Sequence, residues 1–266
     1  MPRLIRFFTG ALVLVTALAA SVRPAHAQID KTVRLTLSDK SQTVHLYRPT
    51  GTVKALVVLS SGDLGWMGFV VDVAEFLRAH DVAVLGLSSR AYLASFTNGK
   101  KALDPAQIPG HYETLAREAQ RLLGVTMRPV LIGISEGAGL SVVAAAEGSK
   151  QSPYRGVIGL GLPESIELGW NSWKDWTIWI TKGEPKQPHM TITPHVSRVS
   201  PLPLILVQST RDEFIPAAET KGLFAAAQEP KRMYSIDAKN HRFSDRQPEL
   251  QRSLLDALEW IDGMDR

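Results

Sequence analysis

The sequence has no cysteine among its 266 residues, which excludes disulfide bonds, thiolate zinc sites and a lipid-modified N-terminal cysteine. Its net charge is also small once the first 27 residues are set aside. Three of the 30 Lys and Arg residues lie in that segment, and none of the 26 acidic residues does, which leaves 27 positive against 26 negative side chains. This balance gives no electrostatic reason to expect nucleic-acid binding.

Residues 1–27 have the pattern of a secretory signal peptide. Arg3 and Arg6 give a positive start, residues 7–22 are apolar or small, and a small-x-small cleavage site ends at Ala27. The alternative is an uncleaved membrane anchor, but the apolar run is short for a membrane span. We therefore expect a periplasmic protein from which this segment is removed after Ala27.

Apolar runs and amphipathic segments alternate through the rest of the chain. Strands are predicted at 32–37, 43–47, 54–60, 82–87, 129–133, 156–161, 202–207 and 233–236, and helices at 69–80, 112–123, 137–147, 217–226 and 249–261. Residues 88–109 show no regular pattern. The alternation predicts an α/β fold in one domain over 28–266. It has a mostly parallel central sheet, helices on both faces and an antiparallel N-terminal edge.

The motif Gly133-Ile-Ser135-Glu-Gly137 follows one of these buried runs and precedes a helical one. A serine at the apex of such a strand–turn–helix is exposed above the sheet, and the glycines let strand and helix pass closely. A glycine-rich turn of this kind can also be purely structural. The motif therefore makes Ser135 a candidate nucleophile whose partners must be found elsewhere.

A serine hydroxyl needs a base to accept its proton, and the base needs an acidic residue to orient it. On this topology the acid and then the histidine should follow the serine, each after a later strand. Asp212 follows the strand at 202–207, and His241 follows the strand at 233–236. We expect Asp212 to orient His241 as the general base, with Glu213 as the rival acid.

Two backbone N–H groups should stabilise the oxyanion of such a reaction. We expect one from Glu136, directly after the nucleophile, and the other from Asp63 in the glycine-containing loop at 61–66. The alternative for that loop is a simple strand–helix turn in which Asp63 caps the helix. No histidine pair has a metal-ligand spacing backed by carboxylates, so we expect neither a metal nor another cofactor.

The sequence resembles the α/β-hydrolase superfamily, and within it the bacterial virulence-protein group typified by AcvB and VirJ, over roughly residues 50–263. The resemblance is carried by the segments at 59–66, 84–92, 131–137 and 240–243. It implies an exported, periplasmic serine hydrolase, linked in some members to hydrolysis of aminoacylated phosphatidylglycerol. In this chain a carboxylate, Glu136, stands where the group usually has an aromatic residue.

Residues 163–201 form an insert between two core strands, and on this topology such an insert can form a cap over the site. They contain four of the six tryptophans, which could line an apolar pocket or a lipid interface, or pack on the edge of the sheet. The aromatic residues expected to contact substrate are Trp66, Tyr92, Trp170 and Trp173.

The combined expectation is an exported serine hydrolase that cleaves a carboxylic ester, such as a lipid or aminoacyl-lipid ester, through an acyl-enzyme. Its partners would be a small-molecule or lipid ester and the membrane surface at its periphery, but no nucleic acid; a protein partner is left open. Two alternatives stay open. One is a peptidase or amidase with the same three residues, and the other is a non-catalytic periplasmic binding protein that keeps the fold.

Overall fold

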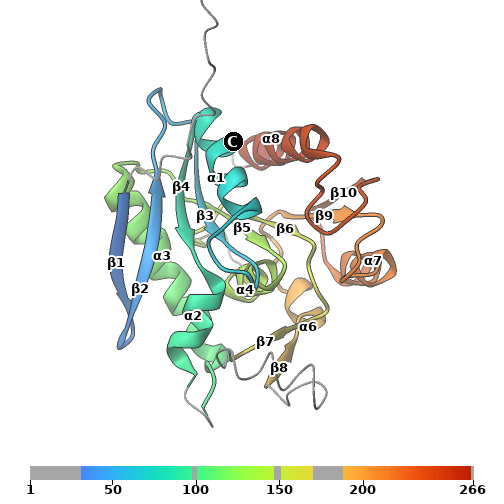
Figure 1. Ribbon diagram of the computed structural model, residues 1–266, viewed down its shortest axis with the longest axis horizontal. Helices are drawn as coiled ribbons and strands as arrows, with labels where there is room; N and C mark the ends of the chain where they lie inside the picture. Colours follow the sequence, from blue (N-terminus) through green and yellow to red (C-terminus); the bar gives the residue numbers. More distant parts are fainter. Residues whose placement is uncertain (1–30, 98–100, 147–150, 170–187, 265–266) are drawn as a thin grey trace, which may run out of the picture.

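The structure is a computed structural model that describes residues 31–97, 101–146, 151–169 and 188–264. Its centre is a sheet of eight strands (Figure 1). The strand order is β1-β2-β4-β3-β5-β6-β9-β10. The strands are β1 (Lys31–Leu37), β2 (Lys40–Tyr47), β3 (Ala55–Ser60), β4 (Val82–Leu87), β5 (Val130–Ile134), β6 (Gly156–Leu160), β9 (Leu204–Ser209) and β10 (Lys231–Ile236). All eight predicted strands are confirmed.

The sheet is parallel from β4 through β10, and the β1–β2 hairpin adds two antiparallel strands at the β4 edge. Parallel neighbours bring the carboxyl ends of β3, β5, β6, β9 and β10 to one edge of the sheet. Open α/β sheets bind their ligands at this edge. The loops that follow these five strands therefore form the candidate site.

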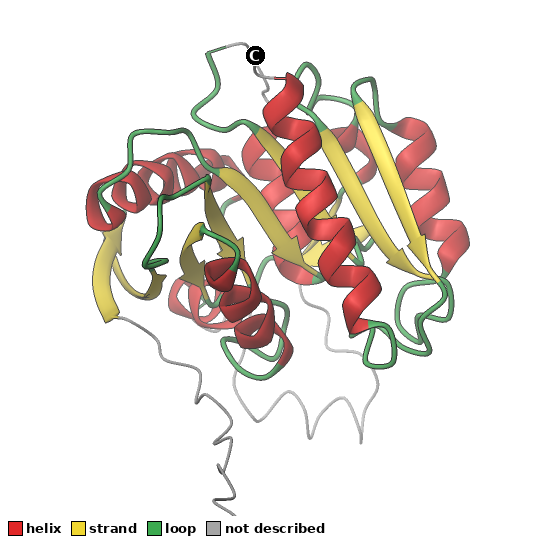
Figure 2. Cartoon of the chain, turned by 90° about the horizontal axis from the view of Figure 1, so that it is seen from above, coloured by secondary structure: helices red, strands yellow, loops and turns green. Residues whose placement is uncertain are grey.

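Helices cover both faces of the sheet (Figure 2). The helices α1 (Phe69–Ala79) and α8 (Gln247–Met264) pack on one face, while α3 (Ile108–Leu123), α4 (Glu136–Ala145) and α7 (Ala217–Ala226) pack on the other. Strand β3 shows why two cores form. Leu56 and Val58 point into the α3–α4 core, whereas Val57 and Leu59 point into the α1–α8 core.

The described part of residues 88–109 contains regular elements, contrary to the prediction. They include α2 (Ser89–Phe96) and a short 3-10 turn (Pro105–Gln107), and α3 begins at Ile108, earlier than predicted. The Ser88 hydroxyl caps α2 by accepting the Ala91 N–H at 3.3 Å. Only Ser89, Tyr92 and Leu93 of α2 are buried, so its apolar pattern is too short to be recognised from periodicity.

The described parts of the predicted insert form a small two-stranded sheet and a short helix. The elements are β7 (Ser165–Glu167), antiparallel β8 (His189–Thr191) and α6 (Thr193–Val196). Ile166 of β7 packs over Gly139 of α4, where a Cβ on the glycine would collide with it. The insert therefore begins beside the helix that follows Ser135, while Trp170 and Trp173 lie outside the described residues.

The predicted signal peptide at 1–27 also lies outside the described residues. Among the helices that the structure does describe, none is both long enough and apolar enough to cross a membrane.

Candidate active site

Ser135 occupies the sharp turn between β5 and α4. Its backbone has φ 52° and ψ −118°, a left-handed region that a non-glycine residue rarely adopts. The glycines on either side have steric reasons to be there. A Cβ on Gly133 would collide with the Gly137 carbonyl oxygen, and a Cβ on Gly137 would collide with the Ser61 carbonyl oxygen. The motif is thus a strained elbow that fixes the serine above the sheet.

The predicted acid and base meet in the structure. His241 Nδ1 lies 2.6 Å from Asp212 Oδ2, and the Asp212 side chain is completely buried. The other carboxylate oxygen, Oδ1, accepts the backbone N–H groups of Phe214 and Ile215, each at 2.9 Å. Burial alone would raise the pKa of Asp212, but these three hydrogen bonds outweigh it and hold the pKa below its ordinary value.

An ionised Asp212 can only accept a hydrogen bond, so the proton between the two groups belongs on His241 Nδ1. This tautomer leaves Nε2 unprotonated and able to act as a base. The rival acid takes a different position. Glu213 Oε2 accepts the backbone N–H of His241 at 2.7 Å and does not bond the imidazole ring.

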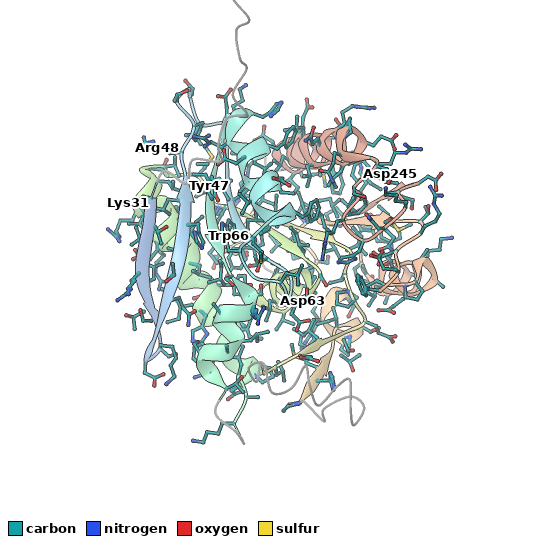
Figure 3. All side chains as sticks on the ribbon, in the orientation of Figure 1. Lys31, Tyr47, Arg48, Asp63, Trp66 and Asp245 are labelled. Atoms are coloured by element: carbon teal, nitrogen blue, oxygen red, sulfur yellow. The ribbon has the colours of Figure 1, made fainter. Side chains whose placement is uncertain are left out.

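The loop that carries His241 is held at both ends. Asp245, labelled in Figure 3, accepts the Lys239 N–H through Oδ1 at 2.9 Å. The fully buried Phe243 ring packs 6.4 Å from the Phe69 ring of α1. Phe243 has a φ of 52°, so the chain reverses tightly just after the histidine. These contacts fix the position from which His241 can face the elbow.

Ser135 and His241 both contact the turn after β6. The Ser135 N–H donates to the Leu160 carbonyl at 2.9 Å, and a Cβ on Gly161 would lie 2.5 Å from His241 Cε1. Within the described part of the chain, no hydrogen bond joins the Ser135 hydroxyl to the ring. Catalytic hydrogen bonds commonly tighten only when substrate is bound. The structure thus brings the three predicted residues to one place with the acid–base pair already formed.

The loop after β3 lies against the elbow. A Cβ on Gly62 would be 3.4 Å from Ser135 Cβ, so the next residue, Asp63, lies beside the nucleophile. No backbone acceptor in the described residues takes the N–H of Asp63 or of Glu136. Two unpaired N–H groups next to a serine fit the predicted oxyanion site.

Trp66 anchors this loop to the sheet. Its ring stacks on His45 at 4.8 Å, its Nε1 donates to the Tyr47 hydroxyl at 3.0 Å, and it fills the space above Gly86 (Figure 3). The structure gives this tryptophan a packing role, because three of its contacts are with strands of the sheet.

Tyr92 lies in the core, where no part of it is exposed and its hydroxyl bonds His111 Nδ1 at 2.8 Å. The expectation that it contacts substrate is therefore not supported by its position. Periodicity over so short a helix does not show which way the ring points.

An exposed apolar rim flanks the elbow, and sequence reasoning missed it. Phe214 is 69% exposed, and its ring meets the His241 ring edge-on at 5.7 Å. Leu64 and Met67, on the loop that passes Ser135, are 46% and 63% exposed. We call Leu64, Met67 and Phe214 the apolar rim. The available signal was their place in the sequence: Leu64 and Met67 lie in the loop that contains Asp63, and Phe214 lies just beyond Asp212.

The sheet order, the elbow and the acid–base pair define an α/β-hydrolase fold. Solved structures with this fold are similar to the chain. An α/β hydrolase, GrgF, from Penicillium sp. sh18 has a TM-score of 0.63 and 16% identity over 86% of this chain and 97% of its own. Est1E from Butyrivibrio proteoclasticus has a TM-score of 0.61 and 13% identity over 86% of this chain and 99% of its own.

A soluble variant of monoglyceride lipase from Saccharomyces cerevisiae has a TM-score of 0.60 and 12% identity, over 91% of this chain and 99% of its own. Identities this low establish the fold alone. The family is established separately, because residues 54–259 match the model of the bacterial virulence protein VirJ. The chain belongs to the VirJ family. No curated protein matches it.

Proposed function

We propose that the protein is a serine hydrolase that cleaves a carboxylic ester through an acyl-enzyme. The observation that carries the proposal is the 2.6 Å pair of His241 and Asp212 beside a serine in a left-handed elbow. The α/β-hydrolase fold is consistent with this chemistry, although a fold by itself does not define a function.

In the proposed reaction, His241 Nε2 takes the Ser135 hydroxyl proton as the serine oxygen attacks the ester carbonyl. The buried Asp212 carboxylate stabilises the imidazolium that forms. The N–H groups of Glu136 and Asp63 stabilise the oxyanion. His241 then protonates the leaving alcohol, and water, activated by the same histidine, hydrolyses the acyl-enzyme.

The proposed substrate class is a lipid or aminoacyl-lipid ester. The apolar rim supports a substrate with an apolar part, because Leu64, Met67 and Phe214 would lose water contact when such a chain lies across them. The sequence pattern at 1–27 supports a periplasmic location, and a lipid substrate would require contact with a membrane surface.

A non-catalytic binding role is the second candidate. It is favoured by one observation, namely that the Ser135 hydroxyl makes no hydrogen bond to the His241 ring in the described structure. A binding protein on this fold would keep its biological role after the serine is removed.

Labelling with a fluorophosphonate probe tests the proposal, with wild type compared with Ser135→Ala. We expect labelling of the wild type and none of the variant, with both proteins folded by circular dichroism. A folded wild type that resists the probe would favour the binding role. Lipid, aminoacyl and simple esters, together with matched amides, then distinguish an esterase from an amidase.

A further inference from the structure

Glu136 directly follows the nucleophile in the chain and carries a carboxyl group. It is the first residue of α4, and its Oε1 is sealed from solvent without a hydrogen-bond partner in the described part of the chain. The backbone N–H of Glu167 hydrogen-bonds the carboxyl from β7. An unpartnered oxygen of this kind is costly to bury, and far more costly when the group carries a charge.

The charged groups that act on Glu136 are both acidic. Glu167 faces it from β7, and Asp63 faces it from the loop after β3. No described residue forms an ion pair with it. Burial first, and then these two carboxylates, raise the pKa of Glu136 to about 8. This shift favours the neutral carboxylic acid at neutral pH.

We propose that Glu136 sets the alkaline limit of the reaction: the serine site works while this carboxyl is neutral and fails when it becomes a carboxylate. This inference rests on the proposed function. Glu136 supplies one of the two N–H groups expected to hold the oxyanion, so its own side-chain charge would lie close to the charge that develops in the transition state. Two like charges in a water-poor site repel each other strongly.

The same geometry explains how a carboxylate can be tolerated in the elbow. Strand β7 packs over α4, Oε1 of Glu136 is shielded from water, and the acidic neighbours oppose ionisation of the carboxyl. The insert that contains Glu167 therefore affects the serine site indirectly: it favours the protonated form of Glu136, and it need not contact Ser135. The charge on Glu136 would thus determine the pH range in which the site works, and Glu136 would not donate a proton in the chemical step.

The experiment measures the rate of fluorophosphonate labelling and of ester hydrolysis between about pH 6 and pH 10 in three proteins. Wild type should lose activity above about pH 8, approaching a tenfold loss per pH unit. Glu136→Gln keeps the size of the side chain without an ionisable group, and its rates should stay level to about pH 9.5. Glu167→Gln removes one repelling charge, so its alkaline limit should move to lower pH.

A second measurement follows the proton itself. Carboxyl carbon resonances of 13C-labelled glutamate should include one that titrates near pH 8 in wild type and is missing from Glu136→Gln. Should Glu136→Gln fail to fold, Glu136→Met is the substitute, because it is also neutral and similar in size.

Three results would overturn the inference. They are a wild type with no alkaline loss, a Glu136→Gln variant that loses activity as wild type does, and a Glu136 resonance that titrates near its ordinary value. Labelling that persists in Ser135→Ala would overturn the proposed function together with this inference. Ser135-dependent labelling with an unchanged alkaline limit in Glu136→Gln would overturn this inference alone.

Discussion

Glu213 Oε2 accepts the backbone N–H of His241 at 2.7 Å, although the neighbouring residue, Asp212, bonds the imidazole ring. Two adjacent acidic side chains thus bind one histidine, one at its ring nitrogen and the other at its backbone N–H. One of them fixes the tautomer of the ring, and the other fixes the backbone from which the ring projects. The structure separates two residues that the sequence leaves as rivals.

Asp212→Asn should lower kcat by about 10⁴-fold, because an amide can donate to Nδ1 and favour the wrong tautomer. Glu213→Gln keeps a carbonyl oxygen for the His241 N–H and should cost about tenfold or less. The measurement is kcat and KM for both variants on one ester. A larger loss in Glu213→Gln would reverse the assignment of the acid.

Gly161 limits where the His241 ring can lie. It has a φ of 56°, and a Cβ there would lie 2.5 Å from His241 Cε1. Gly161→Ala should therefore displace the ring and lower kcat by about 10²-fold, since a shift of about 1 Å can have that effect. Gly222→Ala is the matched control, because a Cβ at Gly222 meets nothing within 4 Å in helix α7.

The control variant should be slightly more stable than wild type and equally active, because alanine favours a helix interior. Thermal unfolding of both variants distinguishes a displaced ring from a general loss of structure. An active Gly161→Ala would show that His241 can act from another position.

Most of the fold could be predicted from the sequence because buried parallel strands are continuous apolar runs. Residues 130–134 and 204–209 are of this kind, and both carry a site residue just beyond them. Helix α2 was missed because its order depends on the Ser88 cap and on tertiary burial of Tyr92. Periodicity does not record either contact.

For the site, the sequence predicts which loops carry the candidate residues. Chain order predicted that Ser135, Asp212 and His241 lie at one edge of the sheet, because each follows a parallel strand that ends there. The direction of a side chain was not predictable. Trp66 packs on His45 and Tyr92 bonds His111, and both partners are distant in sequence. The apolar rim was equally invisible, because exposure depends on the loops that surround it.

The stability of the protein should depend on pH through Glu136. Its pKa is raised from 4.5 to about 8 in the folded state, so the folded protein binds the proton more tightly than the unfolded chain. The stability that this contributes is fully present below pH 4.5 and is lost as pH rises through about 8. Glu136→Gln does not titrate and should lack this loss.

Denaturant unfolding of wild type and Glu136→Gln at pH 5, 7 and 9 measures the effect, within the range where both remain folded. The unfolding free energy of wild type, relative to the variant, should fall between pH 5 and about pH 8 and change little above that. A constant difference between the two proteins would mean that Glu136 ionises in its ordinary range.

The apolar rim should determine how well long acyl chains are used. Met67 is 63% exposed and lies on the loop that passes Ser135 at Gly62. An acyl chain that covers Met67 would remove its apolar surface from water. Met67→Ser should lower kcat/KM for long-chain esters about three- to tenfold and leave short-chain esters almost unchanged. Met264→Ser is the matched control, because Met264 is similarly exposed, at 52%, at the end of α8. Equal losses on short and long chains would instead point to a disturbed oxyanion loop, and no loss on either would remove the rim from the substrate path.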